Sequence, residues 1–136
     1  MTLPIQQSAF AVLTANEYNK GVALLTPGAW QTITLAGGWT NRATYTPASY
    51  RKVFNGSMLH IVLNLSAGTT TNGTTIFTLP AGYTPISKVQ MSIITRIAAA
   101  PQQIGAIEID TGGVAKIFDV GATATLHANS LIPLDL

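Results

Sequence analysis

Residues 57–66 read SMLHIVLNLS, and the alternation in this stretch decides the fold class. Every second residue from Leu59 to Leu65 is aliphatic. Because successive side chains of a strand point to opposite sides, the stretch predicts a β-strand with one face in the core. The other face is too apolar for bare solvent and too polar for a dry core, so we expect a wet subunit interface there. That face carries Met58, His60, Val62 and Asn64.

Two hairpins are predicted, one beside this strand and one further along the chain. Asn55-Gly56 suits a type I′ turn because both residues accept positive φ, which makes residues 50–54 the partner strand. A second hairpin covers residues 104–120, with a connection at residues 111–113. Its predicted cross-strand pairs are Asp110 with Val114, Glu108 with Lys116 and Ala106 with Phe118, while Ile107, Ile109, Ala115 and Ile117 share the core face.

Short runs rich in β-branched and aromatic residues continue along the chain and indicate an all-β fold. Pro133 cannot donate to a ladder, so the last strand should lie at an edge or pair on one side only. We expect a single antiparallel β-barrel or sandwich of about seven or eight strands. The remaining predicted strands are Gln31–Leu35, Thr74–Leu79, Lys88–Ile97 and a C-terminal run in which Ile132, Leu134 and Leu136 alternate.

Residues 1–28 are predicted to form an N-terminal attachment arm ahead of a head domain at residues 29–136. Within the arm, residues 16–20 fit a short helix or turn that Gly21 ends. A length of 136 residues fits one core. Residues 1–10 lack the basic start and apolar stretch of a secretory signal, so we expect synthesis in the host cytoplasm and release by another route, such as lysis.

The composition indicates a surface that partners partly cover. Hydrophobic residues make up 47% of the chain and charged residues only 9%, against roughly 25% charged in an average soluble domain. A spanning helix needs about 18 or more apolar residues, and the longest apolar stretches are far shorter, so no membrane partner is expected. Lysines and arginines stand singly apart from Arg51-Lys52, which argues against nucleic acid. Without cysteine there is no disulfide framework.

No constellation of residues predicts an enzyme. His60 and His127 are the only histidines and have no metal-ligand spacing, so we expect neither a metal nor another cofactor. Glu108 and Asp110 would lie about 7 Å apart on one strand face, which could serve an inverting glycosidase pair. An exposed hairpin face with Lys116 opposite is the favoured alternative, because nothing would desolvate either carboxylate and raise its pKa.

One loop combines aromatic and polar residues in a way that suits saccharide binding. An aromatic ring stacks on the apolar face of a sugar, while amide and guanidinium groups bond its hydroxyls. For Trp39 the alternative, that it caps the barrel end and packs in the core, is favoured. His60, Arg96 and His127 are predicted as interface or symmetry-axis residues and not as ligands. The loop residues are Trp39, Asn41, Arg42 and Tyr45.

Taken in order, these motifs resemble the C-terminal head domains of tail-fibre and receptor-binding proteins of tailed phages. The most specific is FTLPAGYTP at residues 77–85, where Pro80, Gly82 and Pro85 turn the backbone and leave Tyr83 at the tip of a rigid loop. The resemblance implies a small β-barrel or sandwich that forms a homotrimer, displays a host-facing tip and, in several members, binds cell-wall saccharide. The other motifs are Trp30–Leu35, Gly38–Asn41, Tyr50–Lys52, Asn55-Gly56, Thr74–Ile76 and Ile107–Asp110.

Two functions from different classes follow. The resemblance favours a trimeric receptor-binding domain of a phage tail fibre or spike, which recognises host surface saccharide through Trp39, Asn41, Arg42, Tyr45 and Tyr83. The short chain without a stalk favours a structural virion protein that decorates the capsid or caps the tail and binds no host ligand. We expect residues 1–28 to bind other virion proteins. The predicted subunit interface is Met58, His60, Val62, Asn64, Arg96, Phe118 and His127.

Overall fold

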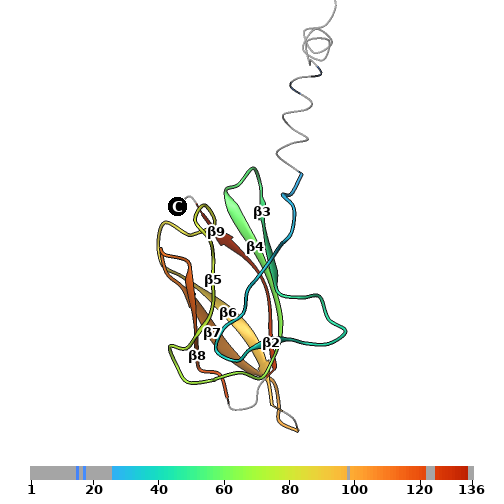
Figure 1. The fold of residues 1–136 in the computed structure, drawn as a ribbon, viewed down its shortest axis with the longest axis vertical. Helices are drawn as coiled ribbons and strands as arrows, with labels where there is room; N and C mark the ends of the chain where they lie inside the picture. The colour runs from blue at the N-terminus through green and yellow to red at the C-terminus, as the bar shows by residue number, and fades with distance from the viewer. Residues whose placement is uncertain (1–14, 16, 18–25, 98, 122–124, 135–136) are drawn as a thin grey trace, which may run out of the picture.

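The computed structural model describes residues 15, 17, 26–97, 99–121 and 125–134, and its strands form one antiparallel sheet (Figure 1). The predicted all-β fold is confirmed. In the arm, Ala15 and Glu17 are helical and exposed, and the rest of the predicted helix or turn at residues 16–20 lies outside the described residues. The strands are β1 (Gln31–Thr32), β2 (Thr40–Asn41), β3 (Ser49–Val53), β4 (Met58–Ser66), β5 (Thr75–Thr78), β6 (Val89–Arg96), β7 (Gln103–Ile109), β8 (Val114–Phe118) and β9 (Thr125–Pro133).

The sheet curls until its first and last strands approach each other. The strand order is β1-β3-β4-β9-β6-β7-β8-β5, and β2 pairs with the end of β4. A bridge joins Leu35 to Phe77, and the Ala36 amide donates to the Ile76 carbonyl at 2.8 Å, so the segment after β1 closes onto β5. The enclosed space is filled by aliphatic side chains. The fully buried ones include Leu59, Ile61, Leu63, Leu65, Ile107, Ile109, Ile117 and Leu126.

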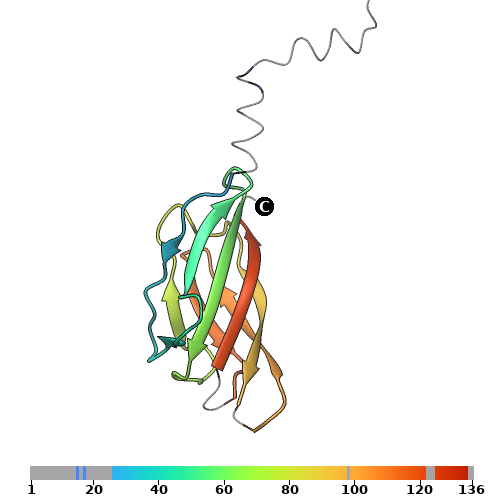
Figure 2. The ribbon, with the colours of Figure 1, turned by 90° about the vertical axis from the view of Figure 1, so that its right-hand side faces the viewer.

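β4 runs through the middle of the sheet between β3 and β9, as Figure 2 shows. The aliphatic residues that alternate from Leu59 to Leu65 are fully buried, which confirms the predicted core face. The side chains between them, from Met58 to Asn64, are half-buried and point outward. Because β4 is paired on both sides, its outward row stands between matching rows of β3 and β9.

Both predicted hairpins form with the predicted register. Asn55 and Gly56 have φ of 56° and 85°, as a type I′ turn requires, and Val53 pairs with Met58 across it. In the second hairpin the cross-strand neighbours are Glu108 with Lys116 and Ala106 with Phe118. The Asp110 amide donates to the Val114 carbonyl at 3.1 Å and closes that hairpin. The turn chemistry of the sequence therefore set the register correctly.

Two strands differ in extent from the expectation. β9 begins at Thr125, well before the alternating run at its end, and it lies inside the sheet between β4 and β6. Pro133 pairs with Met58 alone, because the β6 ladder ends at His127, so the expected one-sided pairing is confirmed. The predicted strand at residues 31–35 is shorter, since the chain leaves β3 after Thr32 and crosses to β5.

The loop after β5 holds Tyr83 differently from the expectation. The Tyr83 amide donates to the Pro80 carbonyl at 3.1 Å, and Gly82 has φ of 88°, so the turn needs its glycine. The Tyr83 ring folds back against Tyr50, with ring centroids 5.0 Å apart, and packs on the core. Lys52 Nζ lies 4.8 Å from the Tyr83 ring centroid. Tyr83 is therefore not an aromatic standing at a loop tip.

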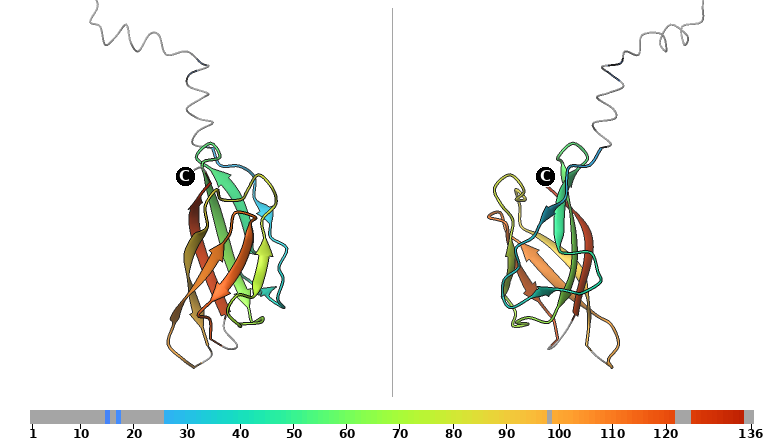
Figure 3. Two further views of the ribbon diagram at one scale, coloured as in Figure 1. Left: turned by 90° about the vertical axis from the view of Figure 1, so that its left-hand side faces the viewer. Right: turned by 45° about the vertical axis from the view of Figure 1, so that its right-hand side comes forward.

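The curl gives the sheet two differently directed outer surfaces. β3, β4 and β9 stand in front in Figure 2, whereas β7 and β8 stand in front in the left view of Figure 3. The chain enters beside β3, where the Gly28 amide donates to the Lys52 carbonyl, and Pro133 ends β9 near the β3–β4 turn. We call the end of the sheet that contains the β3–β4 turn the arm end, and the opposite end of the sheet the far end. Within the described part of the chain, no helix has the length and apolarity to span a membrane.

Candidate functional site

The outward rows of β3, β4 and β9 form a continuous surface, which we call the β4–β9 face. It contains two hollows of about 430 and 490 Å³, and both are lined in part by Asn129 and Ser130. None of the three strands contains an acidic residue. The face is built from Arg51, Val53, Met58, His60, Val62, Asn64, His127, Asn129 and Leu131.

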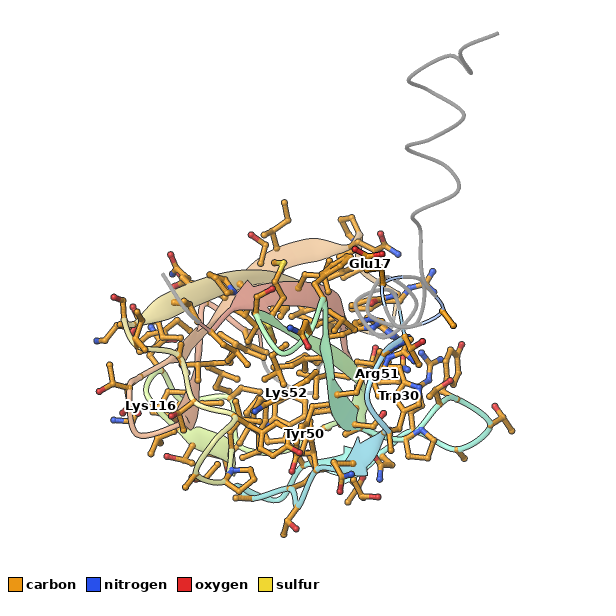
Figure 4. The ribbon with its side chains drawn as sticks, turned by 90° about the horizontal axis from the view of Figure 1, so that it is seen from above. Glu17, Trp30, Tyr50, Arg51, Lys52 and Lys116 are labelled. Atoms are coloured by element: carbon orange, nitrogen blue, oxygen red, sulfur yellow. The ribbon has the colours of Figure 1, made fainter. Side chains whose placement is uncertain are left out.

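The Trp30 cluster, made of Trp30, Arg51, His60 and Asn129, lies toward the arm end. Arg51 and His60 are cross-strand neighbours in the β3–β4 ladder. Trp30 rests on both, with its ring 4.3 Å from the Arg51 guanidinium carbon and 4.9 Å from the His60 ring centroid. Trp30 remains 43% exposed, so it offers an indole surface that a ligand can reach. Figure 4 shows Trp30 and Arg51 together on one side of the barrel, away from Lys116.

His60 carries its polar partner from the neighbouring strand. Its Nε2 lies 2.7 Å from Asn129 Oδ1, and because an amide oxygen only accepts, His60 Nε2 is the donor. The hollow beside this pair is also lined by Phe54 and Leu131, each 49% exposed. Arg51 Nε is buried without a hydrogen-bond partner among the described residues. The cluster thus places apolar side chains next to hydrogen-bond donors and acceptors.

The Tyr45 cluster, made of Arg42, Tyr45, Asn64 and His127, lies on the same face toward the far end. The Arg42 guanidinium carbon is 4.2 Å from the Tyr45 ring centroid, and the Tyr45 and His127 rings are 5.8 Å apart. Tyr45 is 45% exposed. The adjoining hollow is lined by hydroxyl, amide and imidazole groups and by three aliphatic residues. Its lining is Thr46, Val62, Asn64, Ser92, Ile94, His127, Ala128, Asn129 and Ser130.

A chain of hydrogen bonds holds the Tyr45 cluster together. Arg42 Nη1 lies 3.1 Å from His127 Nε2, and because arginine only donates, that ring nitrogen must accept. His127 therefore carries its proton on Nδ1, which donates to Asn64 Oδ1 at 3.0 Å. Asn64 Nδ2 in turn donates to the Thr46 carbonyl at 3.0 Å. The neutral imidazole thus links the loop to the sheet.

The electrostatics of His127 agree with this arrangement. Burial is the larger cause that lowers the pKa of His127 below its ordinary value, and the nearby Arg42 and Arg96 guanidinium groups add to it. Arg96 comes from β6 and Arg42 from the loop, so two cations face the ring from different elements. His127 is therefore kept neutral over a wider pH range than a free histidine.

The loop that carries Arg42 and Tyr45 is fixed at both ends. Asn41 Oδ1 accepts from the Ala48 amide at 2.8 Å, and the Arg42 amide donates to the Asn64 carbonyl at 2.9 Å. Asn41 therefore shapes the loop through its side-chain oxygen. Sequence reasoning grouped Asn41, Arg42 and Tyr45, and the structure brings Arg42 and Tyr45 into contact.

Two of the five predicted saccharide-site residues lie elsewhere. Trp39 is only 3% exposed, and its Nε1 donates to the Thr69 carbonyl at 3.1 Å. It packs in the core, which is the alternative that the sequence favoured, and it presents no ring face to a ligand. Tyr83 packs on Tyr50 and is separate from both clusters. Burial raises the pKa of Tyr50, and Tyr83 adds to that rise.

The two carboxylates considered for hydrolysis take part in structural contacts. Asp110 Oδ1 accepts from the Gly112 and Val114 amides at 2.9 and 3.0 Å and so shapes the hairpin turn. Glu108 lies 3.6 Å from Lys88 Nζ. Within the described residues, no three histidine and carboxylate groups lie close enough to hold a metal ion.

The predicted subunit-interface residues divide between two surfaces. Met58, His60, Val62, Asn64 and His127 belong to the β4–β9 face. Phe118 instead lies on the outer surface of β6, β7 and β8, which we call the β6–β8 face. It is the cross-strand neighbour of Ala106 there. The face also carries Ile104, which pairs with Ile94, and these isoleucines are 77% and 46% exposed. Ile94 and Arg96 stand where the two faces meet, because they are the cross-strand neighbours of His127 and Thr125 on β9.

The sequence did not identify Trp30, Arg51 or Asn129 as residues of a binding site. A signal existed for Arg51, because the Asn55-Gly56 turn places it opposite His60 in the hairpin register. Trp30 reaches the face from the segment before β1, and no periodicity shows where such a residue docks. Asn129 belongs to the early part of β9, whose mixed polarity hides the strand.

Comparisons with known proteins identify solved structures of similar fold. No protein-family model and no curated protein matches the sequence. The receptor binding protein of Listeria phage PSA is similar in structure, with a TM-score of 0.61 and 18% identity over 96% of this chain and 80% of that one. The head domain of lactococcal phage bIL170 has a TM-score of 0.58 and 12% identity over 79% of this chain and 98% of its own. This chain has the fold of the receptor-binding head domains of phages.

Proposed function

We propose that this protein is the receptor-binding head of a phage tail fibre or spike and attaches the virion to saccharide on the host surface through its β4–β9 face. The observation that carries the proposal is the pair of exposed aromatic residues, Trp30 and Tyr45, on that face. Trp30 contacts His60, which lines one hollow, and Tyr45 contacts His127, which lines the other. Two solved structures of similar fold are a receptor binding protein of a Listeria phage and the head domain of a lactococcal phage, which supports the same role.

The chemistry of the face suits a sugar. Trp30 and Tyr45 present apolar ring surface, and the surrounding arginine, histidine and asparagine groups can bond hydroxyls. Arg51 and Arg42 add positive charge, and no carboxylate from β3, β4 or β9 opposes it. Neutral and anionic saccharides are therefore favoured over cationic ligands. The proposal assigns binding and no catalysis to these residues.

The proposal includes a homotrimer assembled through the β6–β8 face. Ile94 and Ile104 are exposed neighbours there, and Phe118 and Arg96 continue the surface. Covering this apolar area stabilises an assembly by about 25 cal/mol for each Å² removed from water. Ile94 also lines the hollow beside the Tyr45 cluster, so the proposed interface borders that hollow. None of the four interface residues lines the hollow beside the Trp30 cluster. Residues 1–28 connect the head to other virion proteins.

Binding to bacterial surface glycans tests the proposal. The full-length protein is applied to an array of bacterial surface polysaccharides and to host cell walls, beside Trp30→Ala and Ile86→Ala. Ile86 is 60% exposed and lines neither hollow, so its variant controls for the loss of an exposed apolar side chain. We expect Trp30→Ala to lose about tenfold in affinity, or about 1.4 kcal/mol, and Ile86→Ala to match the wild type. A protein that binds no bacterial glycan or cell wall would favour a structural role in the virion.

A further inference from the structure

We infer that the saccharide is a linear chain of repeating units that occupies the Trp30 and Tyr45 clusters together, an inference that rests on the proposed function. Each cluster contains one exposed aromatic ring, one arginine, one histidine and one asparagine. The arginine carbon lies 4.3 Å from the Trp30 ring in one and 4.2 Å from the Tyr45 ring in the other. The same set of recognition groups therefore occurs twice on one face.

The histidine and asparagine of the two clusters come from opposite strands of the same pair. In the Trp30 cluster, His60 on β4 bonds Asn129 on β9 at 2.7 Å. In the Tyr45 cluster, His127 on β9 bonds Asn64 on β4 at 3.0 Å. Both asparagine oxygens accept from a ring nitrogen, so each histidine is oriented by its neighbour. The two subsites thus contain the same kinds of side chain, and in each the histidine is oriented by an asparagine of the neighbouring strand.

Exposure is also matched between the two clusters. Trp30 is 43% exposed and Tyr45 is 45% exposed, so each ring is supported from beneath and open to a ligand. Both rings lie on the same sheet surface, and each is in contact with an arginine guanidinium group. Tyr83, in contrast, packs against the core. A ligand that suits one cluster therefore suits the other.

The two hollows are neighbours along the strand pair. Asn129 and Ser130 line both of them. His127 lies opposite Asn64, which is four residues beyond His60 on β4, so the subsites are separated by roughly 13 Å along the strand. A single sugar cannot contact both. An oligosaccharide laid along β4 and β9 can, with one end toward the arm end and the other toward the far end.

Two like subsites beside neighbouring hollows favour a repeating ligand. Once one repeat is bound, the next is held near the second subsite at a high effective concentration, so affinity rises with chain length without any new kind of contact. A ligand without repeats would present different groups to the two subsites. The gain on lengthening should therefore require both aromatic residues.

Calorimetric titration with ligands of graded length tests this inference. The probes are oligomers of one, two and three repeating units, prepared from the bacterial polysaccharide that binds most strongly on the array. The protein is the full-length wild type, Trp30→Ala, Tyr45→Ala and the double variant, with Ile86→Ala as control. For the wild type we expect about two molecules of the one-repeat probe per chain, and at least tenfold tighter binding when the probe is long enough to span both subsites.

The variants separate the possible outcomes. Trp30→Ala and Tyr45→Ala should each bind about one molecule of the one-repeat probe per chain and lose the gain on lengthening, while Ile86→Ala keeps it. An undiminished gain in either single variant would overturn the inference. So would one molecule of the one-repeat probe per wild-type chain, although the proposed receptor-binding function would then still stand. Only the absence of binding to every glycan would remove both.

Discussion

Arg42 Nη1 donates to His127 Nε2 across 3.1 Å and ties the loop after β2 to β9. Because an arginine cannot accept, this contact requires a neutral imidazole with its proton on Nδ1. The same proton bonds Asn64 on β4, so three segments distant in sequence depend on one protonation state. The Tyr45 cluster is therefore sensitive to any proton added to His127.

Acidification should weaken the Tyr45 cluster and the fold together. The pKa of His127 is lower in the folded chain than in the unfolded one, so the unfolded chain binds more protons at pH values between the two. Stability is then lost as the pH falls below about 6.5. Protonation also places a donor on Nε2 opposite the Arg42 donor, with Arg96 as a second cation nearby. Thermal unfolding from pH 7 to pH 5 measures the effect.

Glutamine variants assign that pH dependence to one histidine. His127→Gln offers Arg42 an acceptor that does not titrate, so its melting temperature should change less with pH than that of the wild type. His60→Gln is the matched control, because it removes the other histidine of the β4–β9 face and leaves the Arg42 contact in place. Equal slopes for His127→Gln and the wild type would show that the Arg42 contact does not respond to protonation.

Arg42→Ala should mainly weaken saccharide binding, whereas Trp39→Ala should mainly lower the stability of the fold. Arg42 bonds His127 and stacks on Tyr45, so its removal should leave assembly unchanged and cost about 0.5–1.5 kcal/mol of stability. Binding to host cell wall should weaken by about tenfold, or about 1.4 kcal/mol. Trp39 is 3% exposed, and its truncation should cost about 3–5 kcal/mol of stability. Adsorption assays and thermal melts on both variants separate the two roles, and wild-type adsorption by Arg42→Ala would remove that loop from the site.

Substitution of Gly68 or of Gly82 should lower the stability of the fold, each for a different physical reason. A Cβ at Gly68 would lie 2.5 Å from Trp39 ring atoms, so Gly68→Ala should overpack the barrel end and cost about 1–3 kcal/mol. Gly82 has open space around it but φ of 88°, so Gly82→Val should be destabilised by backbone strain of roughly 1–2 kcal/mol. Gly82→Asn tests the difference, because asparagine tolerates positive φ and should recover most of the loss in a denaturant titration. Equal losses for valine and asparagine would contradict the conformational account.

The proposed trimer should depend on the β6–β8 face. Ile104 is 77% exposed beside Ile94, so Ile104→Arg should place a desolvated charge in the interface and dissociate the assembly. Sedimentation should change from three times the chain mass of 14.3 kDa to that of a single chain. Ile86→Arg, at a 60% exposed site outside both faces, should remain trimeric. A wild-type protein that sediments as a stable monomer at micromolar concentration would contradict the proposal.

Local patterns were sufficient to predict the strands and their register. The alternation in β4 and the glycine turns at residues 55–56 and 111–113 depend on neighbours in sequence, and the structure follows them closely. The early part of β9 was missed because Ala128, Asn129 and Ser130 do not alternate in polarity. Its strand forms because β4 and β6 supply partners on both sides, which is information that lies elsewhere in the chain.

The site was harder to predict than the fold for the same reason. Arg42 and Tyr45 are close in sequence, and both were selected from the loop. Their partners His127 and Asn64 were assigned to an interface, because the sequence does not show that β9 places them beside that loop. Trp39 and Trp30 look alike in the sequence, yet one is buried against Gly68 and the other rests on the sheet surface. Long-range packing decides which tryptophan a ligand can reach.

Locating a bound saccharide tests the central claim most directly. The full-length protein is crystallised with the bacterial oligosaccharide that binds most strongly on the array, and the position of the sugar is determined. The account predicts sugar rings stacked on Trp30 or Tyr45 on the β4–β9 face, with hydroxyls bonded by the neighbouring histidine and asparagine groups. A saccharide bound on the β6–β8 face or in the loops of the far end, with Trp30 and Tyr45 free of contact, would contradict it.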